Sequence, residues 1–388
     1  MELEKTYDIG TSKNIMELMK LFLKANIVES VLWFDTKKTR FDLAPKEITN
    51  PDDLTQDLLG QYCLYNYDRL DTTANFVRKK LDGAKNKKIA VIAKPCDIRA
   101  FIELSKVRQV NLDNILIVGI ECPETINKKV LIKTLEKEGI DTEKIVGESR
   151  ISVEQISFKL ETGNKIIDIK DGLIYLNCTR CPRKISMKSD LNIGERGQDK
   201  WIIQIVSEKG KKAIDSVATD NLISGISEGE NELVNKLIDI SQQNRAADFE
   251  KLDAMTNKER FKLFYDTFSK CRKCASCINV CPVCFCHDCD LQRKTKLERA
   301  DKKAGVENWE KMDRILYILT KMGHMCDSCI ECGKCSQVCP VGIPSADTYR
   351  YINDKIQKKY GYVAGNSVDE MSPRSGIEVK KLLEALNK

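Results

Sequence analysis

The sequence predicts an α/β domain with a parallel sheet, followed by a small domain organised by cysteine. Residues 1–250 alternate short apolar runs with amphipathic segments and hold five cysteines, whereas twelve of the 17 cysteines lie between Cys271 and Cys339. The second stretch also repeats one cysteine pattern 58 residues apart. A chain of 388 residues, 42% of them hydrophobic, is long enough for two separate cores.

The first domain shows alternating helix and strand signals. Ile15, Leu18 and Phe22 follow helical spacing, and the strand-like runs further on are rich in β-branched residues. The expected elements, in order, are a helix at 13–24, strands at 30–34 and 88–93, a helix at 97–107 and a strand at 114–120. A strand, a helix and a strand in succession form a βαβ unit, so we expect parallel strands.

The domain boundary is expected in the polar stretch 241–257, between a helix-like run and an aromatic-rich one. This gives a first domain at 1–250, a second at 257–350 and a tail at 351–388. The second domain contains an inserted helix between the cysteine repeats. One face of this helix carries an apolar stripe that is expected to pack in a core rather than bind a cofactor. The stripe consists of Trp309, Met312, Ile315, Leu316, Leu319 and Met322.

Charge and histidine content exclude several functions. The net charge of +6 would be cancelled by three four-iron clusters of about −2 each, thiolates included, and the lysine runs at 85–88 and 209–212 are typical of solvated faces. No nucleic-acid partner is therefore expected. The only histidines, His287 and His324, lie near cysteines, which excludes a Ser-His-Asp triad or a histidine-rich metal site elsewhere.

The location of the protein follows from its apolar runs and its first residues. No run approaches the roughly 20 apolar residues of a membrane helix, and the acidic start does not resemble a signal peptide. We expect a cytoplasmic protein without a membrane span. In that compartment cysteines are metal ligands more often than disulfides.

Each cysteine repeat reads C-x2-C-x2-C-x3-C-P, the bacterial ferredoxin pattern for four-iron clusters. Three closely spaced thiolates bind one cluster, and the fourth, beside proline, reaches the other. A pair of zinc sites would need neither the third close cysteine nor the fourth. The expected ligands are Cys271, Cys274, Cys277 and Cys339 for the first cluster, and Cys329, Cys332, Cys335 and Cys281 for the second.

Four cysteines of this region remain unassigned: Cys284, Cys286, Cys289 and Cys326. They either form a further metal site, which would make a fourth centre, or neighbour the clusters as spare thiols. The spacing of the first three is too dense for ordinary core cysteines, yet it leaves the metal site and the spare thiols as equal alternatives. Cys326 lies three residues before Cys329 and could compete for the second cluster.

The first domain has a less regular set of cysteines. Cys96 follows the strand 88–93 and Cys122 follows the strand 114–120, so both lie at carboxyl ends of parallel strands. Cys178 and Cys181 add a C-x2-C pair. These four either bind a third cluster or are structural thiols, while Cys63 is expected to lie away from the strand ends.

Several motifs resemble the β subunits of deazaflavin-dependent (coenzyme F420) hydrogenases and formate dehydrogenases. The resemblance covers most of residues 1–350 and is closest to the formate dehydrogenase β subunit. The motifs are Lys94-Pro95-Cys96-Asp97, Asn111-Leu112-Asp113-Asn114, Gly119-Ile120-Glu121-Cys122, Cys178-x2-Cys181 with Asp190 and Gly194, and Cys281-Pro282-Val283-Cys284-Phe285-Cys286.

The resemblance implies a flavoprotein-like first domain that binds FAD beside a four-iron cluster held by Cys96, Cys122, Cys178 and Cys181. Gly10, Thr11 and Ser12, where a helix begins, would bind a flavin phosphate, together with Lys94. The family usually has two glycines in this loop, whereas this chain has one.

The expected function is electron transfer within a cytoplasmic oxidoreductase complex. Flavin would exchange electron pairs and the clusters single electrons. The resemblance implies a formate dehydrogenase α-like catalytic subunit or heterodisulfide reductase-like subunits as partners, and ferredoxin as a donor or acceptor. The alternative is a flavin-free adaptor, similar to a polyferredoxin, that only docks and wires a catalytic subunit. No catalytic acid, base or nucleophile is expected.

Overall fold

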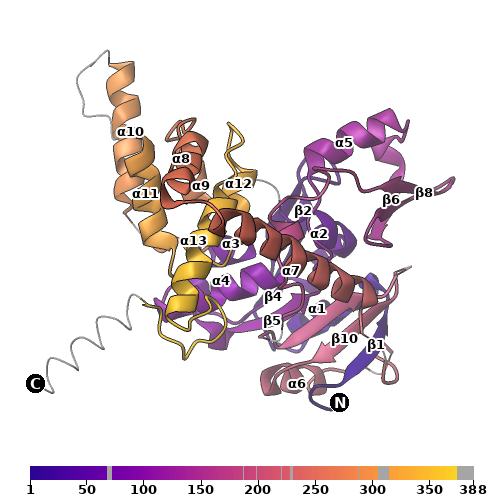
Figure 1. Cartoon of the computed structure of the whole chain (residues 1–388). Coiled ribbons are helices and arrows are strands. Elements are labelled where there is room, and N and C mark those ends of the chain that lie inside the picture. The colour runs from indigo at the N-terminus through magenta and orange to yellow at the C-terminus, as the bar shows by residue number, and fades with distance from the viewer. Residues whose placement is uncertain are drawn as a thin grey trace, which may run out of the picture. The chain divides into compact units, whose positions relative to one another are not determined.

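The computed structural model describes residues 1–67, 72–186, 188–197, 199–219, 221–227, 230–286, 288–304 and 314–373. Its contacts divide the chain into unit 1, residues 1–98 and 110–245, and unit 2, residues 99–109 and 246–388. Each unit has a hydrophobic core of its own. Figure 1 labels helices and strands of both units. Trp309 and Met312 of the expected inserted helix lie outside the described residues.

The elements that begin in unit 1 alternate strands and helices. In chain order they are β1 (Thr6–Gly10), α1 (Ser12–Lys24), β2 (Ser30–Thr36), β3 (Leu43–Ile48), α2 (Leu59–Tyr65), α3 (Thr73–Lys80), β4 (Ile89–Ala93), α4 (Pro95–Lys106), β5 (Ile115–Ile120), α5 (Lys128–Lys137), β6 (Ile145–Arg150), β7 (Gln155–Leu160), β8 (Gly163–Asp168), β9 (Leu191–Glu195), β10 (Trp201–Ile205), α6 (Glu208–Asp215) and α7 (Glu232–Asp253).

A seven-stranded mixed sheet forms the centre of unit 1, in the order β1-β10-β9-β5-β4-β2-β3. The pairs β2·β4, β4·β5 and β5·β9 are parallel, which confirms the predicted parallel strands and α/β class. The outer strands β1, β10 and β3 pair antiparallel, so the sheet is mixed rather than purely parallel. Every residue of β4 and β5 is buried, as expected for central strands covered on both faces.

Amphipathic packing explains why α1 forms where the spacing predicted it. Ile15, Met19 and Phe22 are fully buried in the same core as strand residues of the sheet. A second, antiparallel sheet of β6, β7 and β8 packs its own apolar face around Phe158 and Ile156. Unit 1 therefore carries two sheets, of which the larger positions the cysteines.

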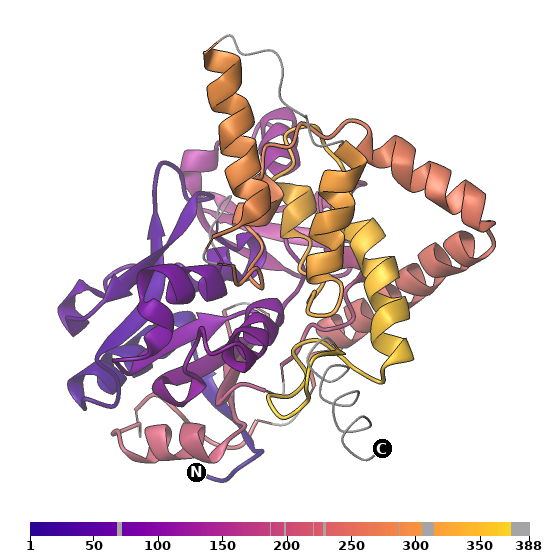
Figure 2. The same cartoon turned by 90° about the vertical axis from the view of Figure 1, so that its left-hand side faces the viewer.

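Unit 2 is helical among its described residues. Its elements are α8 (Asn257–Phe268), α9 (Ser276–Asn279), α10 (Asp290–Lys303), α11 (Arg314–Met325), α12 (Lys334–Gln337) and α13 (Ser345–Lys359). Thr256 begins α8 with a capping box to Glu259, and Figure 2 shows the corner between α7 and α8 at this point. The polar stretch 241–257, where the domain boundary is expected, is mostly helical, because α7 continues to Asp253.

The two cysteine repeats have the same local structure. In the first, Ala275 has a left-handed backbone (φ 62°) and α9 follows; in the second, Gly333 (φ 75°) precedes α12. Each one-turn helix carries the third cysteine of its repeat, Cys277 or Cys335. The sequence repeat is therefore also a repeat of backbone conformation.

Two segments outside the expected domain 257–350 belong to unit 2. Arg99, on α4, donates hydrogen bonds to the carbonyls of Ala364 (3.0 Å) and Ile330 (2.7 Å). Glu103 accepts hydrogen bonds from Tyr362 Oη (2.6 Å) and Gly365 N (2.7 Å). Buried polar contacts thus connect residues 99–109 with the described part of the expected tail.

Candidate metal centres

The structure gathers the thiols expected for the first cluster. Burial raises the pKa of the Cys271 thiol, and the negative charges of three neighbouring thiolates raise it further. These neighbours are Cys277, Cys274 and Cys339. Cys339 comes from the second repeat, so the fourth thiol reaches across as the motif predicts.

The thiols expected for the second cluster lie together as well. Burial raises the pKa of Cys332 well above its usual value, with further contributions from Cys281, Cys335 and Cys329. Burial and nearby thiolates, Cys335 among them, raise the pKa of Cys281 to about 12. Cys281 belongs to the first repeat, which completes the reciprocal exchange.

Backbone amides and apolar side chains complete these surroundings. Lys273 N–H donates to Cys271 Sγ (3.4 Å) and Ile343 N–H donates to Cys339 Sγ (3.3 Å). Phe268, Ile318 and other apolar residues enclose the first set. Four soft thiolate donors per set, with amide hydrogen bonds to sulfur, fit a four-iron cluster.

The additional cysteines lie close to the second set. Cys284, Cys286 and Cys289 line a cavity of about 170 Å³, which His324 also lines. Cys326 is not among the lining residues; its Sγ lies 3.8 Å from Gly323 O. Within the described ranges, no three His, Cys, Asp or Glu side chains are grouped closely enough to hold a single metal ion.

In unit 1, the sheet brings the expected cysteines to one edge. Ala93, at the end of β4, pairs with Gly119 of the parallel strand β5, so Cys96 and Cys122 follow neighbouring strand ends. A 3₁₀ turn at Cys178–Arg180 places Cys178 nearby. Burial raises the pKa of Cys178 to about 11, and the charges of Cys122 and Cys181 contribute to the rise. The thiols of Cys122 and Cys181 therefore lie near that of Cys178.

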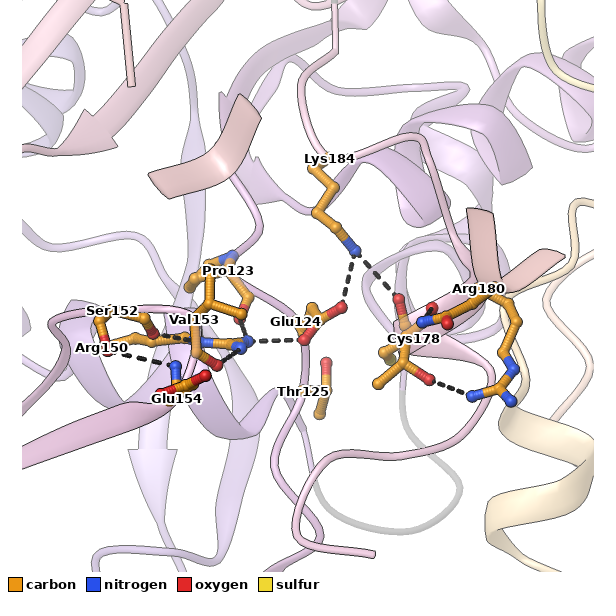
Figure 3. Close-up of polar contacts among 12 residues, drawn as sticks. Pro123, Glu124, Thr125, Arg150, Ser152, Val153, Glu154, Cys178, Arg180 and Lys184 are labelled. Carbon is orange, nitrogen blue, oxygen red and sulfur yellow. Dashed lines mark hydrogen bonds and ion pairs between the residues drawn. The ribbon is translucent and has the colours of Figure 1, made fainter. Parts of the chain in front are cut away.

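A buried ionic network, which sequence reasoning missed, connects the two loops of this site (Figure 3). Lys184 Nζ donates to Glu124 Oε1 (3.1 Å) and to Cys178 O (3.0 Å). Arg150 Nη1 donates to Glu124 Oε2 (2.6 Å) and to Pro123 O (2.7 Å). The only sequence signal is proximity, because Glu124 follows Cys122 by two residues and Lys184 follows Cys181 by three.

Cys63 does not lie where the sequence predicted. Its Sγ lies 3.6 Å from Glu121 O, at the end of β5, rather than away from the strand ends. Burial raises the pKa of this thiol well above its usual value, so it is a protonated, packed side chain. Cys63 lies on α2, a helix that the sequence analysis did not predict, and this helix brings its thiol to Glu121.

The helix N-terminus expected to bind a flavin phosphate is already filled by carboxylates. Ser12 N–H donates to Asp199 Oδ1 (3.3 Å), and Ser12 Oγ lies 3.0 Å from that oxygen and 2.5 Å from Asp57 Oδ2. Burial raises the pKa of Asp57, and the charge of Asp199 also contributes. Two acidic side chains repel a phosphate, so Gly10, Thr11 and Ser12 do not fit the role that the resemblance implied.

Lys94 is equally unsuited to a direct flavin contact. Lys94 is 1% exposed, and its ammonium group donates to Cys63 O (2.7 Å) and Thr125 Oγ1 (3.2 Å). The ring of Tyr62 lies 5.8 Å from the same nitrogen. These contacts assign Lys94 to positioning α2 and the loop after Cys122.

A cavity of about 820 Å³ opens beside this site, within unit 1. Glu121 and Pro123, which flank Cys122, line it, as do Cys63 and the carboxylate Glu195. Arg196 forms a two-pronged ion pair with Glu121 (2.7 and 3.0 Å) on its wall. The cavity is lined by charged residues of both signs and is large enough for a nucleotide-sized ligand.

Comparison with known proteins defines the class and then the family resemblance. Residues 267–343 match the model of a 4Fe-4S dicluster domain, so this part of the chain is an iron–sulfur domain. Residues 86–227 match the family described as the C terminus of the beta subunit of coenzyme F420 hydrogenase/dehydrogenase. The resemblance to these β subunits that the motifs predicted is thereby confirmed.

Two curated relatives match nearly the whole chain. The F420-dependent formate dehydrogenase subunit beta of Methanocaldococcus jannaschii is 28% identical over 373 residues, which is 92% of each chain. The F420-dependent formate dehydrogenase 1 subunit beta of Methanococcus maripaludis is 28% identical over 382 residues, covering 92% of this chain and 91% of that one. The similarity includes both units.

A solved structure is similar in fold. A chain of the F420-reducing [NiFe] hydrogenase complex from Methanosarcina barkeri has a TM-score of 0.53 at 15% identity. The match covers 66% of this chain and 95% of that chain. Among the described residues, no helix combines the length and apolar character needed to cross a membrane.

Proposed function

We propose that this chain is the electron-transfer β subunit of an F420-linked oxidoreductase complex of the formate dehydrogenase type. It would pass electrons between a two-electron carrier in unit 1 and one-electron partners of the dicluster domain. The observation that carries this proposal is that Cys339 lies beside Cys271 of the first repeat and Cys281 beside Cys332 of the second. This placement supports the ligand arrangement of a two-cluster ferredoxin.

The proposed ligands follow the thiol groups described above. Cys271, Cys274, Cys277 and Cys339 would hold one cluster, Cys329, Cys332, Cys335 and Cys281 a second, and Cys96, Cys122, Cys178 and Cys181 a third. When bound, such clusters accept and release single electrons. The protein contributes burial, amide hydrogen bonds to sulfur and fixed charges, which set the potentials.

We place the two-electron carrier in the 820 Å³ cavity beside Cys122. A deazaflavin or FAD carries anionic phosphate groups, and the lysines Lys200 and Lys236 line this cavity beside the Arg196–Glu121 ion pair. Asn231 and Arg196 both bind the Glu121 carboxylate, which orients that wall. The cavity favours a carrier-binding subunit over a flavin-free adaptor.

The test uses the chain purified without oxygen together with its partner subunits. Reduced F420 should bleach the iron–sulfur absorbance, and acid extraction should show whether a yellow flavin is also present. Arg196→Gln should raise the apparent KM for F420 while the iron content stays unchanged, and the exposed Lys159→Gln on β7 should change neither. Bleaching by ferredoxin alone, with no response to F420 and no flavin, would instead support the adaptor.

A further inference from the structure

Lys321 is a buried cation in the dicluster domain. The residue lies on α11 between the two cysteine repeats and is 3% exposed. Its Nζ donates to Cys277 O (3.1 Å) and lies 5.0 Å from the centre of the Tyr349 ring. In the described part of the chain, no carboxylate forms an ion pair with it.

A buried ammonium group without a carboxylate is costly unless another negative charge compensates it. Here the facing groups are cysteines from both sets: Cys277 of the first set, and Cys281 and Cys335 of the second. Lys321 lines the cavity of about 170 Å³ together with Cys281 and donates to Cys277 O, so its ammonium group lies beside thiols of both sets.

The other buried lysine near a thiol set is compensated differently. Lys184 in unit 1 also donates to a cysteine carbonyl, but Glu124 lies 3.1 Å away and neutralises it. Among the residues that the structure describes, no carboxylate does the same for Lys321. Its field acts on the thiol sets at short range, where screening by salt is weak.

We propose that Lys321 is the shared counter-charge of both clusters in the dicluster domain and raises both reduction potentials. This rests on the proposed ligation by the two thiol sets. Reduction adds one negative charge to a cluster that is already anionic, and a fixed cation nearby stabilises the reduced form more than the oxidised form. Lys321 is a positioning residue in this role, because it acts through the thiolates and exchanges no electrons.

The experiment is a redox titration of the anaerobically purified holoprotein, followed by electron paramagnetic resonance. Lys321→Met removes the charge and the hydrogen bond, and Lys321→Gln removes the charge while keeping an N–H donor for Cys277 O. In both variants the reduced-to-oxidised ratio of both clusters, at a fixed ambient potential, should fall about tenfold. For a one-electron couple this equals a shift of about 59 mV to lower potential.

Two controls separate charge from packing. Lys321→Arg keeps the charge and should keep both potentials close to wild type. Lys262→Met removes an exposed charge of the same unit and should shift neither. If Lys321→Met does not assemble clusters, the Gln and Arg variants decide the question.

Two outcomes have different meanings. Wild-type protein without iron or cluster signals would refute the proposed cluster ligation itself. Intact clusters whose potentials do not move in Lys321→Gln, or a shift in only one cluster, would overturn the shared role of Lys321 and leave the proposed function standing.

Discussion

Lys184 Nζ lies 3.1 Å from Glu124 Oε1, and the two side chains are 2% and 4% exposed. Glu124 also binds Arg150, which is 3% exposed, so one carboxylate compensates two buried cations. Because Lys184 also donates to Cys178 O, this pair joins the loop after Cys122 to the loop that carries Cys178. The network thus positions the proposed third cluster site.

Glu124→Gln should therefore be strongly destabilising. It leaves two buried cations without a carboxylate, and the expected loss in the free energy of unfolding is about 3–5 kcal/mol. Lys184→Met should cost less, since Arg150 still pairs with Glu124. Asp266→Asn breaks an exposed ion pair with Lys262 and should cost under about 1 kcal/mol. Urea denaturation of the anaerobic holoprotein measures all three, and equal losses would contradict the argument.

The Glu195 carboxyl should make stability depend on pH. Burial raises the pKa of Glu195 from 4.5 to about 7, and the charge of Asp199 contributes. Between pH 4.5 and 7 the folded state therefore holds a proton that the unfolded chain releases, so the free energy of unfolding falls as pH rises. The slope is about 1.4 kcal/mol per pH unit at most.

Glu195→Gln should remove this slope and stabilise unit 1 at about pH 8, above the folded-state pKa. Glu154 lines the same cavity but is exposed, so Glu154→Gln is the matched control and should leave the slope in place. Denaturant titrations at several pH values on both sides of neutrality provide the comparison. A slope that survives in Glu195→Gln would assign it to another group.

The left-handed residue before each short cluster helix offers a paired test. Ala275 has φ 62°, which costs an L-residue with a Cβ roughly 1–2 kcal/mol, whereas Gly333 has φ 75° at little cost. Ala275→Gly should stabilise unit 2 by up to about 1 kcal/mol, and Gly333→Ala should destabilise it by a similar amount. The rate of iron loss to a chelator measures the change in stability of unit 2 in both variants. If both variants shift this rate in the same direction, the left-handed backbone of Ala275 is not strained.

Sequence reasoning succeeded where the relevant information was local. The C-x2-C-x2-C-x3-C-P repeats define both thiol sets, because closely spaced thiols follow directly from the chain and only the fourth crosses between the repeats. The apolar runs at β4 and β5 predicted the parallel centre of the sheet for the same reason. Neither inference needed knowledge of distant contacts.

The failures concern contacts between residues far apart in the chain. Asp199 reaches Ser12 across 187 residues and occupies the helix N-terminus that the local pattern assigned to a phosphate. Arg99 contacts Ala364 across 265 residues, so the crossover helix contributes to unit 2.

The stripe expected to pack in a core is wrong in part, because Leu316 and Leu319 are 54% and 45% exposed. The buried face of α11 instead carries Tyr317, Lys321 and Met325, and no local pattern distinguishes this lysine from a solvated one.

Iron removal should unfold unit 2. Its core contains Cys271 among the buried residues and several more cysteines packed against it, so without clusters these thiols would face one another without a ligand. Metal binding free energy is folding free energy in such a domain. Chelation of the full chain should abolish the unit 2 transition in calorimetry while a transition from unit 1 remains. A cooperative unit 2 transition in iron-free protein would contradict this.

Cys181→Ser tests the third cluster in the full chain. Serine is a poorer ligand than thiolate, so the iron content of protein purified without oxygen should fall by about four of about twelve atoms. The paramagnetic signals of the dicluster domain should persist, because that domain draws no proposed ligand from unit 1. Cys63→Ser is the matched control: Cys63 lies at the same strand end, yet burial raises the pKa of its thiol far above neutrality, so it should keep full iron content. Unchanged iron in Cys181→Ser would make Cys122, Cys178 and Cys181 structural thiols. The proposed route from the 820 Å³ cavity to the dicluster domain would then lack its first centre.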